Sequence, residues 1–184
     1  MTRGLFGPGT IVLGGGAVLL TIVLFIGFLL PTNWSAAAEL RIEAPREALM
    51  PLLDSPEGWR AWTAWPDSGL TRSGPPRGQG AAIAWEDTEL GVGSFTIGEV
   101  SSDSVMYAVT VDGAANTVMI TNGVIQLEAL GNATLVHWRE SGDLGRNPLM
   151  GFWALTMERA QQRELQKSLG QLAEAISSGS EPNR

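Results

Sequence analysis

The chain of 184 residues contains no cysteine and a single histidine, His137. The absence of cysteine excludes disulfides, thiolate nucleophiles and Cys-ligated metal centres. One histidine excludes metal sites built from several histidines and mechanisms that pair two of them. No pair of carboxylates stands at a spacing that indicates acid–base chemistry. The sequence therefore predicts no catalytic residue, no metal site and no cofactor.

Positive charge is also scarce, with 12 Lys plus Arg against 19 Asp plus Glu and a net charge of −7. Because nucleic-acid binders need clustered positive charge, no nucleic-acid partner is predicted. Gly91 and Gly93 lack the third glycine of a dinucleotide-binding motif. Gly142 and Gly145 precede a predicted helix without the Lys-Ser/Thr of a P-loop, although an anion held by Arg146 stays an alternative there.

One long apolar run is present: residues 11–30 carry no charge and are bracketed by Pro8 and Pro31. A helix of that length crosses a hydrocarbon core of about 30 Å, so we predict a single-pass transmembrane helix. The alternative is a cleaved signal peptide ending at the alanines 36–38, but the run is longer than a signal h-region. Arg3 favours the orientation with the N-terminus inside and the domain extracytoplasmic, and the opposite orientation stays open.

The sequence accordingly predicts five parts, which are an N-terminal tail (1–10), a transmembrane helix (11–30), a linker (31–34), one domain (35–178) and a flexible tail (179–184). In the domain, Ala38, Leu40 and Ile42 alternate with charged residues and predict a first strand over 35–43. Two short helical turns follow, the first over 46–53.

The rest of the domain reads as strands and then one helix. Strand-like segments joined by short turns cover 70–73, 81–87, 89–100, 104–112, 117–129 and 134–141. Strands in such succession predict an antiparallel meander. A helix over 148–177 follows, with an apolar stripe made by Leu165, Leu169, Leu172 and Ile176. The predicted class is α+β, a curved meander wrapped on a long C-terminal helix, with two short helices after the first strand.

Several segments are typical of one family: 30–34 (LPTNW), 42–45 (IEAP), 59–65 (WRAWTAW), 83–86 (IAWE), 91–94 (GVGS), 134–138 (TLVHW), 142–146 (GDLGR) and 149–151 (LMG). Over residues 30–176 the chain resembles the START-like, helix-grip (SRPBCC) superfamily of polyketide cyclase/dehydrase and lipid-transport proteins, and within it the membrane-anchored bacterial members. The resemblance implies an apolar cavity between the sheet and the long helix. It implies no particular activity, because that superfamily includes binders, cyclases and dehydratases without a shared catalytic signature.

Aromatic side chains dominate the candidate ligand-binding residues. The predicted cavity lining is Trp59, Trp62, Trp65, Trp85, Tyr107, Trp138, Trp153 and Met157. Core filling is the competing interpretation for each tryptophan. Strand parity places Tyr107 on the apolar face of its strand, where its hydroxyl would bond a ligand or a buried partner. The same parity puts His137 on the solvated face, opposite Trp138, and not in the role of a general base.

These features predict a membrane-tethered module that binds a hydrophobic small molecule, lipid-like or aromatic. A cyclase- or dehydratase-type enzyme on the same cavity is the first alternative, and a scaffold with a filled pocket is the second. The lack of acid–base machinery favours a non-enzymatic binder. The predicted partners are the hydrophobic ligand and the membrane, and the predicted localisation is a single-pass membrane protein.

Overall fold

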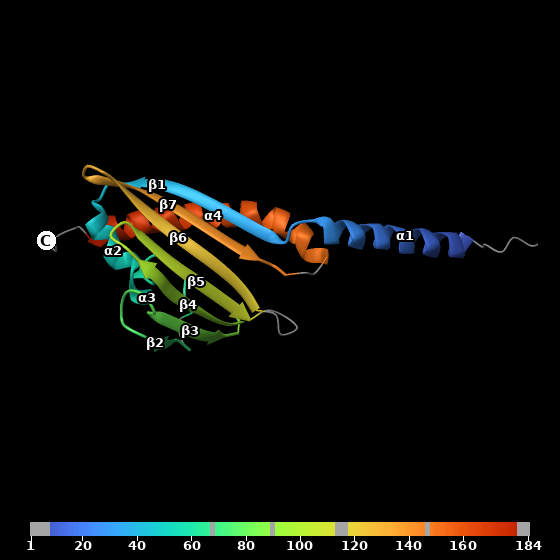
Figure 1. Ribbon diagram of the computed structural model, residues 1–184, viewed down its shortest axis with the longest axis horizontal. Coiled ribbons are helices and arrows are strands. Elements are labelled where there is room, and N and C mark those ends of the chain that lie inside the picture. Colours follow the sequence, from blue (N-terminus) through green and yellow to red (C-terminus); the bar gives the residue numbers. More distant parts are fainter. Residues whose placement is uncertain (1–7, 67–68, 89–90, 113–117, 146–147, 180–184) are drawn as a thin grey trace, which may run out of the picture.

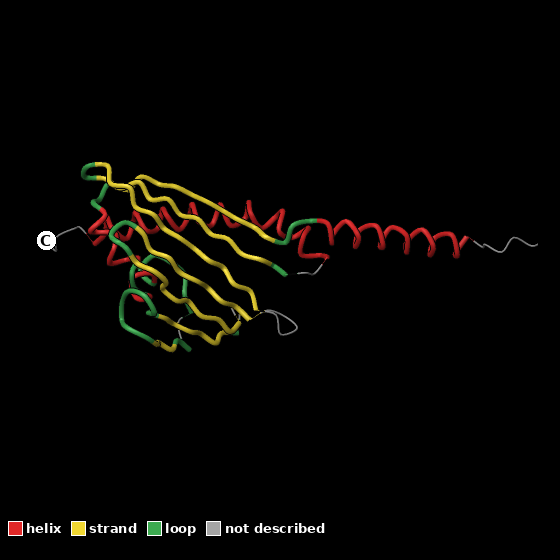
Figure 2. Tube along the Cα trace, in the orientation of Figure 1, coloured by secondary structure: helices red, strands yellow, loops and turns green. Residues whose placement is uncertain are grey.

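The computed structural model describes residues 8–66, 69–88, 91–112, 118–145 and 148–179 (Figure 2). The side chains of residues 8–13 and of Leu155 are outside this description. Arg3, Arg146 and the end of the C-terminal tail, on which parts of the sequence interpretation rest, lie outside the described residues.

The elements run in the predicted order, with small shifts at their ends. They are α1 (Pro8–Leu29), β1 (Asn33–Ile42), α2 (Arg46–Leu53), α3 (Pro56–Trp59), β2 (Thr71–Ser73), β3 (Ala82–Asp87), β4 (Gly91–Val100), β5 (Ser104–Asp112), β6 (Val118–Leu130), β7 (Ala133–Asp143) and α4 (Pro148–Gly179). The prediction of an α+β fold with an antiparallel sheet and a long C-terminal helix is confirmed, and the arrangement is consistent with a helix grip.

The described strands form one seven-stranded antiparallel sheet in the order β1-β7-β6-β5-β4-β3-β2. Strands β2 to β7 are a meander, in which each pairs with the strand before it. Strand β1 instead pairs with β7, in a register that runs from Asn33 opposite Asp143 to Ile42 opposite Thr134. Helix α4 lies across one face of the sheet, close to β1 and β7 (Figure 1).

Helices α2 and α3 close one end of the sheet. The Ser55 side chain caps α3 by accepting a hydrogen bond from the backbone N–H of Gly58 at 3.1 Å. Gly58 has no room for a side chain, because a Cβ there would come within 2.4 Å of the Pro51 carbonyl oxygen. The close packing holds α3 so that Trp59 enters the core, where its indole Nε1 donates to the Leu53 carbonyl at 2.6 Å.

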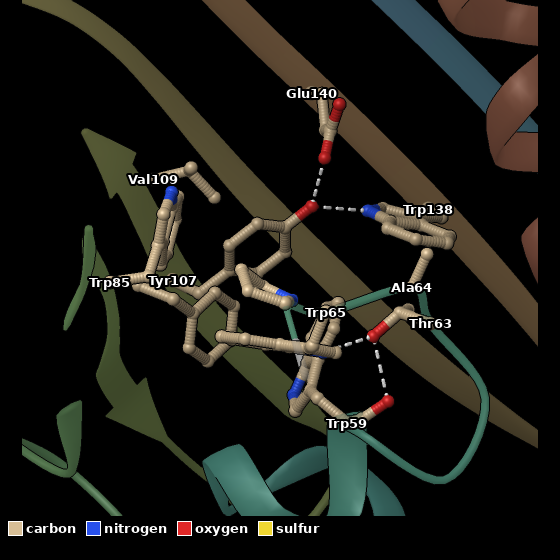
Figure 3. A pocket seen from close by; sticks show the side chains of 11 residues that line it. Trp59, Thr63, Ala64, Trp65, Trp85, Tyr107, Val109, Trp138 and Glu140 are labelled. Atoms are coloured by element: carbon tan, nitrogen blue, oxygen red, sulfur yellow. Dashed lines mark hydrogen bonds between the residues drawn. The ribbon is translucent and has the colours of Figure 1, made fainter. Parts of the chain in front are cut away.

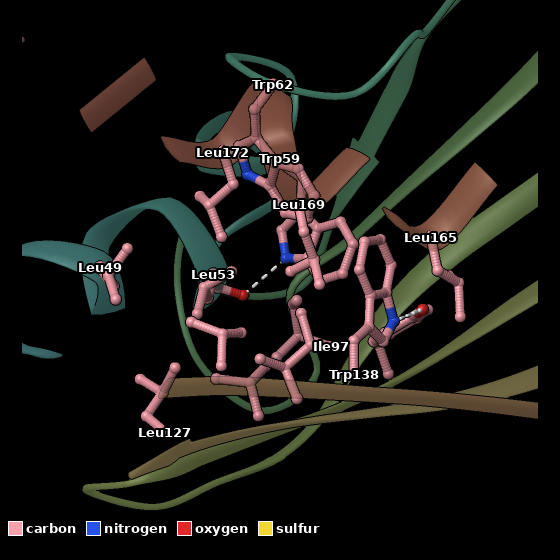
Figure 4. Packing of buried hydrophobic residues seen from close by; sticks show 14 of the residues in the cluster. Leu49, Leu53, Trp59, Trp62, Ile97, Leu127, Trp138, Leu165, Leu169 and Leu172 are labelled. Atoms are coloured by element: carbon pink, nitrogen blue, oxygen red, sulfur yellow. Dashed lines mark hydrogen bonds between the residues drawn. The ribbon is translucent and has the colours of Figure 1, made fainter. Parts of the chain in front are cut away.

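The core lies between the sheet, α2 and α4 (Figure 4). The stripe predicted on the long helix faces inward: Leu165, Leu169 and Leu172 are buried, and Ile176 is partly buried against the same cluster. Leu49 and Leu53 of α2 meet this stripe from the end of the sheet. The apolar face of the sheet must be covered to keep it from water, and the apolar stripe of α4 covers it.

Helix α1 extends away from the sheet (Figure 1). The end of α1 packs closely on the start of α4, and glycines at the contact leave no room for a side chain. A Cβ at Gly27 would lie 2.0 Å from the Pro148 carbonyl oxygen, and one at Gly151 would lie 2.5 Å from Leu30 Cβ. Within the described part of the chain, no helix is long and apolar enough to cross a bilayer. The predicted transmembrane helix over 11–30 is therefore not shown. The side chains of its residues 11–13 are among those that the structure does not describe.

Candidate functional site

A cavity of about 210 Å³ lies between the segment 59–66 and the sheet (Figure 3). Its walls are Trp59, Thr63, Ala64, Trp65, Pro66, Trp85, Phe95, Tyr107, Val109, Trp138 and Glu140. Among the described residues, none that lines the cavity belongs to α4. The lining is mostly apolar and aromatic, as is usual for small-molecule sites.

The structure brings together Trp59, Trp65, Trp85, Tyr107 and Trp138 from the predicted set around this cavity. The other three predicted residues, Trp62, Trp153 and Met157, lie elsewhere.

Trp62 lies just behind the cavity, with its ring 4.7 Å from that of Trp59 and its Nε1 donating to the Leu52 carbonyl at 3.0 Å. Trp153 is 57% exposed, and Met157 packs partly buried against the core. The first turns of α4 lie beside the end of α1, so the wall that we expected from this helix comes instead from residues 63–66.

The rings around the cavity support one another. The Trp59 centroid lies 4.6 Å from that of Tyr107 and 4.9 Å from that of Phe95. Trp65 meets Trp85 edge-on, with centroids 5.8 Å apart and an interplanar angle of 85°. Each such pair contributes about 0.5–1.5 kcal/mol beyond the burial of its area. These contacts between the rings hold the aromatic walls of the cavity in place.

Thr63 fixes the segment that covers the cavity. Its hydroxyl donates to the Trp59 carbonyl at 2.7 Å and accepts a hydrogen bond from Trp65 Nε1 at 2.6 Å. The backbone of α3 and the ring of Trp65 are thereby linked through one side chain (Figure 3). This link holds Trp65 over the cavity.

A buried polar chain forms the other wall. Trp138 Nε1 donates to the Tyr107 hydroxyl at 2.7 Å, and that hydroxyl donates to Glu140 Oε1. Gln161 of α4 donates from Nε2 to the second carboxyl oxygen, Glu140 Oε2, at 2.6 Å. Glu140 is only 6% exposed. Both carboxyl oxygens therefore accept a hydrogen bond in a largely apolar environment.

The surroundings change the acidity of both groups. Burial raises the pKa of Glu140, and the hydrogen bonds from Tyr107 and Gln161 oppose that rise in part. Burial, together with the nearby Glu140 carboxylate, raises the pKa of Tyr107 well above its ordinary value of 10.0. Tyr107 therefore stays a phenol at neutral pH and remains the hydrogen-bond donor of the pair.

Gly123 makes the contact between the two groups possible. In the register of the sheet, Tyr107 on β5 is opposite Gly123 on β6, which is opposite Glu140 on β7. A Cβ on Gly123 would lie 2.1 Å from Tyr107 Cζ. The phenol ring thus occupies the space that any side chain at this position would fill.

Glu140 was missed in the sequence, although strand parity could have found it. It shares a face with Val136 and Trp138, which are buried. His137 lies on the other face, as expected, where its ring nitrogens are 3.3 Å from Glu39 and 3.5 Å from Glu128. This half-exposed histidine has no contact with the cavity.

The family model described as polyketide cyclase / dehydrase and lipid transport matches residues 33–177. No curated protein matches the chain.

Solved structures show the same fold. The Aha1 dimer from Colwellia psychrerythraea is 18% identical, with a TM-score of 0.54 over 80% of this chain and 98% of that one. CalU16 from Micromonospora echinospora is 15% identical, with a TM-score of 0.53 over 78% and 76%. TTHA0849 from Thermus thermophilus is 17% identical, with a TM-score of 0.58 over 80% and 99%.

Proposed function

Because the chain belongs to the polyketide cyclase / dehydrase and lipid transport family, we propose that it binds a small hydrophobic molecule, lipid-like or aromatic. The observation that carries the proposal is the cavity of about 210 Å³ with aromatic walls. An apolar cavity of about 150 Å³ in another protein is enough to hold benzene. This cavity has room for one or two rings or a short chain, and each buried CH₂ contributes about 0.8 kcal/mol.

Naphthalene titrated into the full-length protein, with tryptophan fluorescence as the signal, tests the proposal. We expect a saturable change that Ala64→Phe abolishes, because Ala64 is exposed and lines the cavity, so that a ring there would fill its entrance. Ala61→Phe is the matched control, since Ala61 is exposed on the same segment and is not part of this wall. Equal binding by both variants would rule out the cavity as the site.

A cyclase- or dehydrase-type activity on the same cavity is a second candidate. The buried pair of Glu140 and Tyr107 favours it, because a carboxyl group of raised pKa beside a cavity is what general acid–base catalysis uses. For such an enzyme, Glu140→Gln would abolish turnover of a bound polyketide while leaving its binding intact. If the wild-type protein turns over no polyketide, and Glu140→Gln only weakens ligand binding, the non-enzymatic binder is favoured.

We also propose that the uncharged segment 11–30 tethers the domain to a membrane in a single pass, with residues 11–13, whose side chains the structure does not describe, completing the span begun by the described part of α1. The side chains that support this are apolar and exposed around the helix: Val18, Leu19, Leu20, Ile22, Phe25, Phe28 and Leu29. A surface of this kind is unusual on a soluble monomer. A tether would raise the local concentration of a ligand that partitions into lipid.

Extraction of membranes with alkaline carbonate tests the tether. We expect the full-length protein to stay in the pellet, and protease protection to place the domain on the extracytoplasmic side. Release of a protein that begins near Ala38 would instead identify residues 1–37 as a cleaved signal peptide.

A further inference from the structure

Glu140 gives the apolar cavity one acidic wall. It is the only acidic residue among the described residues that line the cavity. The hydrogen-bond partners of its carboxyl group, Tyr107 and Gln161, both donate to it. A carboxylate has about four lone-pair sites, and two are used here. The unused capacity of Glu140 is therefore that of an acceptor.

The rest of the wall has the same electrostatic preference. The faces of Trp59, Trp65, Trp85 and Phe95 carry the negative side of the ring quadrupole, which attracts cations. The lining includes no Lys, Arg or His among the residues described. Aromatic rings and a carboxyl group thus line the same cavity, and both favour a ligand of positive charge.

We propose that the cavity recognises a small organic cation, an ammonium group carried on an apolar body of about one ring. The ammonium nitrogen pairs with Glu140, and the aromatic rings hold the N-bound carbons and the ring of the ligand. This inference rests on the proposed function, because it takes the cavity to be a binding site and specifies what enters it.

The energetics favour a cation because the carboxyl group is already buried. Forming an ion pair in a protein interior is usually offset by the cost of removing both charges from water. Here the fold has already removed Glu140 from water, so only the ligand is desolvated on binding. Charge-assisted hydrogen bonds are about twice as strong as neutral ones, and cation–π contacts add to them.

The groups around Glu140 make its charge sensitive to pH. At its position in the sheet it is flanked by Ala36 on β1 and Gly123 on β6. The Tyr107 phenol faces it from β5, and the neutral Gln161 amide faces it from α4. Because burial raises the Glu140 pKa, the side chain loses its proton at a higher pH than an ordinary glutamate does. Affinity for a cation therefore rises as pH increases through that pKa.

Three ligands of matched size test the inference on the full-length protein by calorimetric titration: 2-phenylethylamine, 2-phenylethanol and ethylbenzene. We expect the amine, which is protonated below about pH 9, to bind at least about tenfold more tightly than the alcohol at pH 8. Glu140→Gln should remove this preference, so that the amine and the alcohol bind the variant with similar affinity. Glu99→Gln, which removes an exposed carboxylate from the sheet, should leave all three affinities unchanged.

The wild-type pH profile needs no variant and gives an independent result. Between pH 5 and 8, amine affinity should rise while ethylbenzene affinity stays level. If the amine binds no more tightly than the alcohol, or its affinity does not change with pH, the cation inference is overturned while hydrocarbon binding still supports the cavity. If none of the three ligands binds, both the inference and the proposed function fail.

Discussion

Tyr107 reaches Glu140 across the whole width of β6, and the two side chains meet over Gly123. The contact joins a phenol on β5 to a carboxyl group on β7, two strands that are not neighbours in the sheet. It also fixes the polar end of a cavity whose other walls are aromatic. The packing of the sheet and the form of the cavity's polar wall therefore depend on the same three positions.

Gly123→Ala should destabilise the protein by about 1–3 kcal/mol, because the new methyl group would overlap the Tyr107 ring in the middle of the sheet. Urea unfolding measures the change. Gly170→Ala is the control: a Cβ there meets nothing within 4 Å, and alanine in a helix should stabilise by about 0.5–1 kcal/mol. A Gly123→Ala protein as stable as the wild type would contradict the packing described.

The pH dependence of stability should carry the signature of Glu140. Its pKa in the folded state is raised above the ordinary value of 4.5, so the folded protein holds this proton to higher pH than the unfolded chain does. The contribution of the protonated Glu140 to the free energy of unfolding is fully present below pH 4.5 and is lost as pH rises through the raised pKa. The free energy of unfolding of the wild type should therefore fall relative to that of Glu140→Gln across this window. Parallel curves for the two proteins would show that the carboxyl group is not perturbed.

Two tryptophans of the cavity wall should differ in how much their indole N–H contributes to the stability of the fold. Trp59 Nε1 donates to the buried Leu53 carbonyl, whereas Trp85 Nε1 is buried without a partner in the described part of the chain. Trp59→Phe leaves that carbonyl unpaired and should cost about 2–4 kcal/mol, against about 1 kcal/mol or less for Trp85→Phe. Urea unfolding of both variants checks the order. The reverse order would mean that the Trp85 indole makes a bond that the structure lacks.

Local patterns in the sequence were sufficient to predict the order and type of the helices and strands. Alternation at Ala38, Leu40 and Ile42 located the first strand, and the stripe from Leu165 to Ile176 oriented the long helix. Short turns between strands required antiparallel neighbours. Tyr107 could be placed inward by parity alone, because its strand is apolar on one face.

The details of the site depend on long-range register, which local patterns do not contain. Nothing near Gly123 in the sequence indicates that a ring from β5 lies over it. Trp153 shares helical spacing with Met157, but α4 begins beside α1, and Trp153 is left exposed. Helical periodicity says which residues share a face and does not say where along the helix the sheet begins.

The indole N–H signals of the seven tryptophans test most directly whether the cavity is the binding site. In a ¹H–¹⁵N spectrum of the full-length protein titrated with naphthalene, the signals of Trp59, Trp65 and Trp85 should shift saturably, because these rings line the cavity. Those of Trp34 and Trp153, which are not part of its wall, should stay in place. Shifts confined to exposed Trp153, or no saturable shift at any tryptophan, would contradict the account.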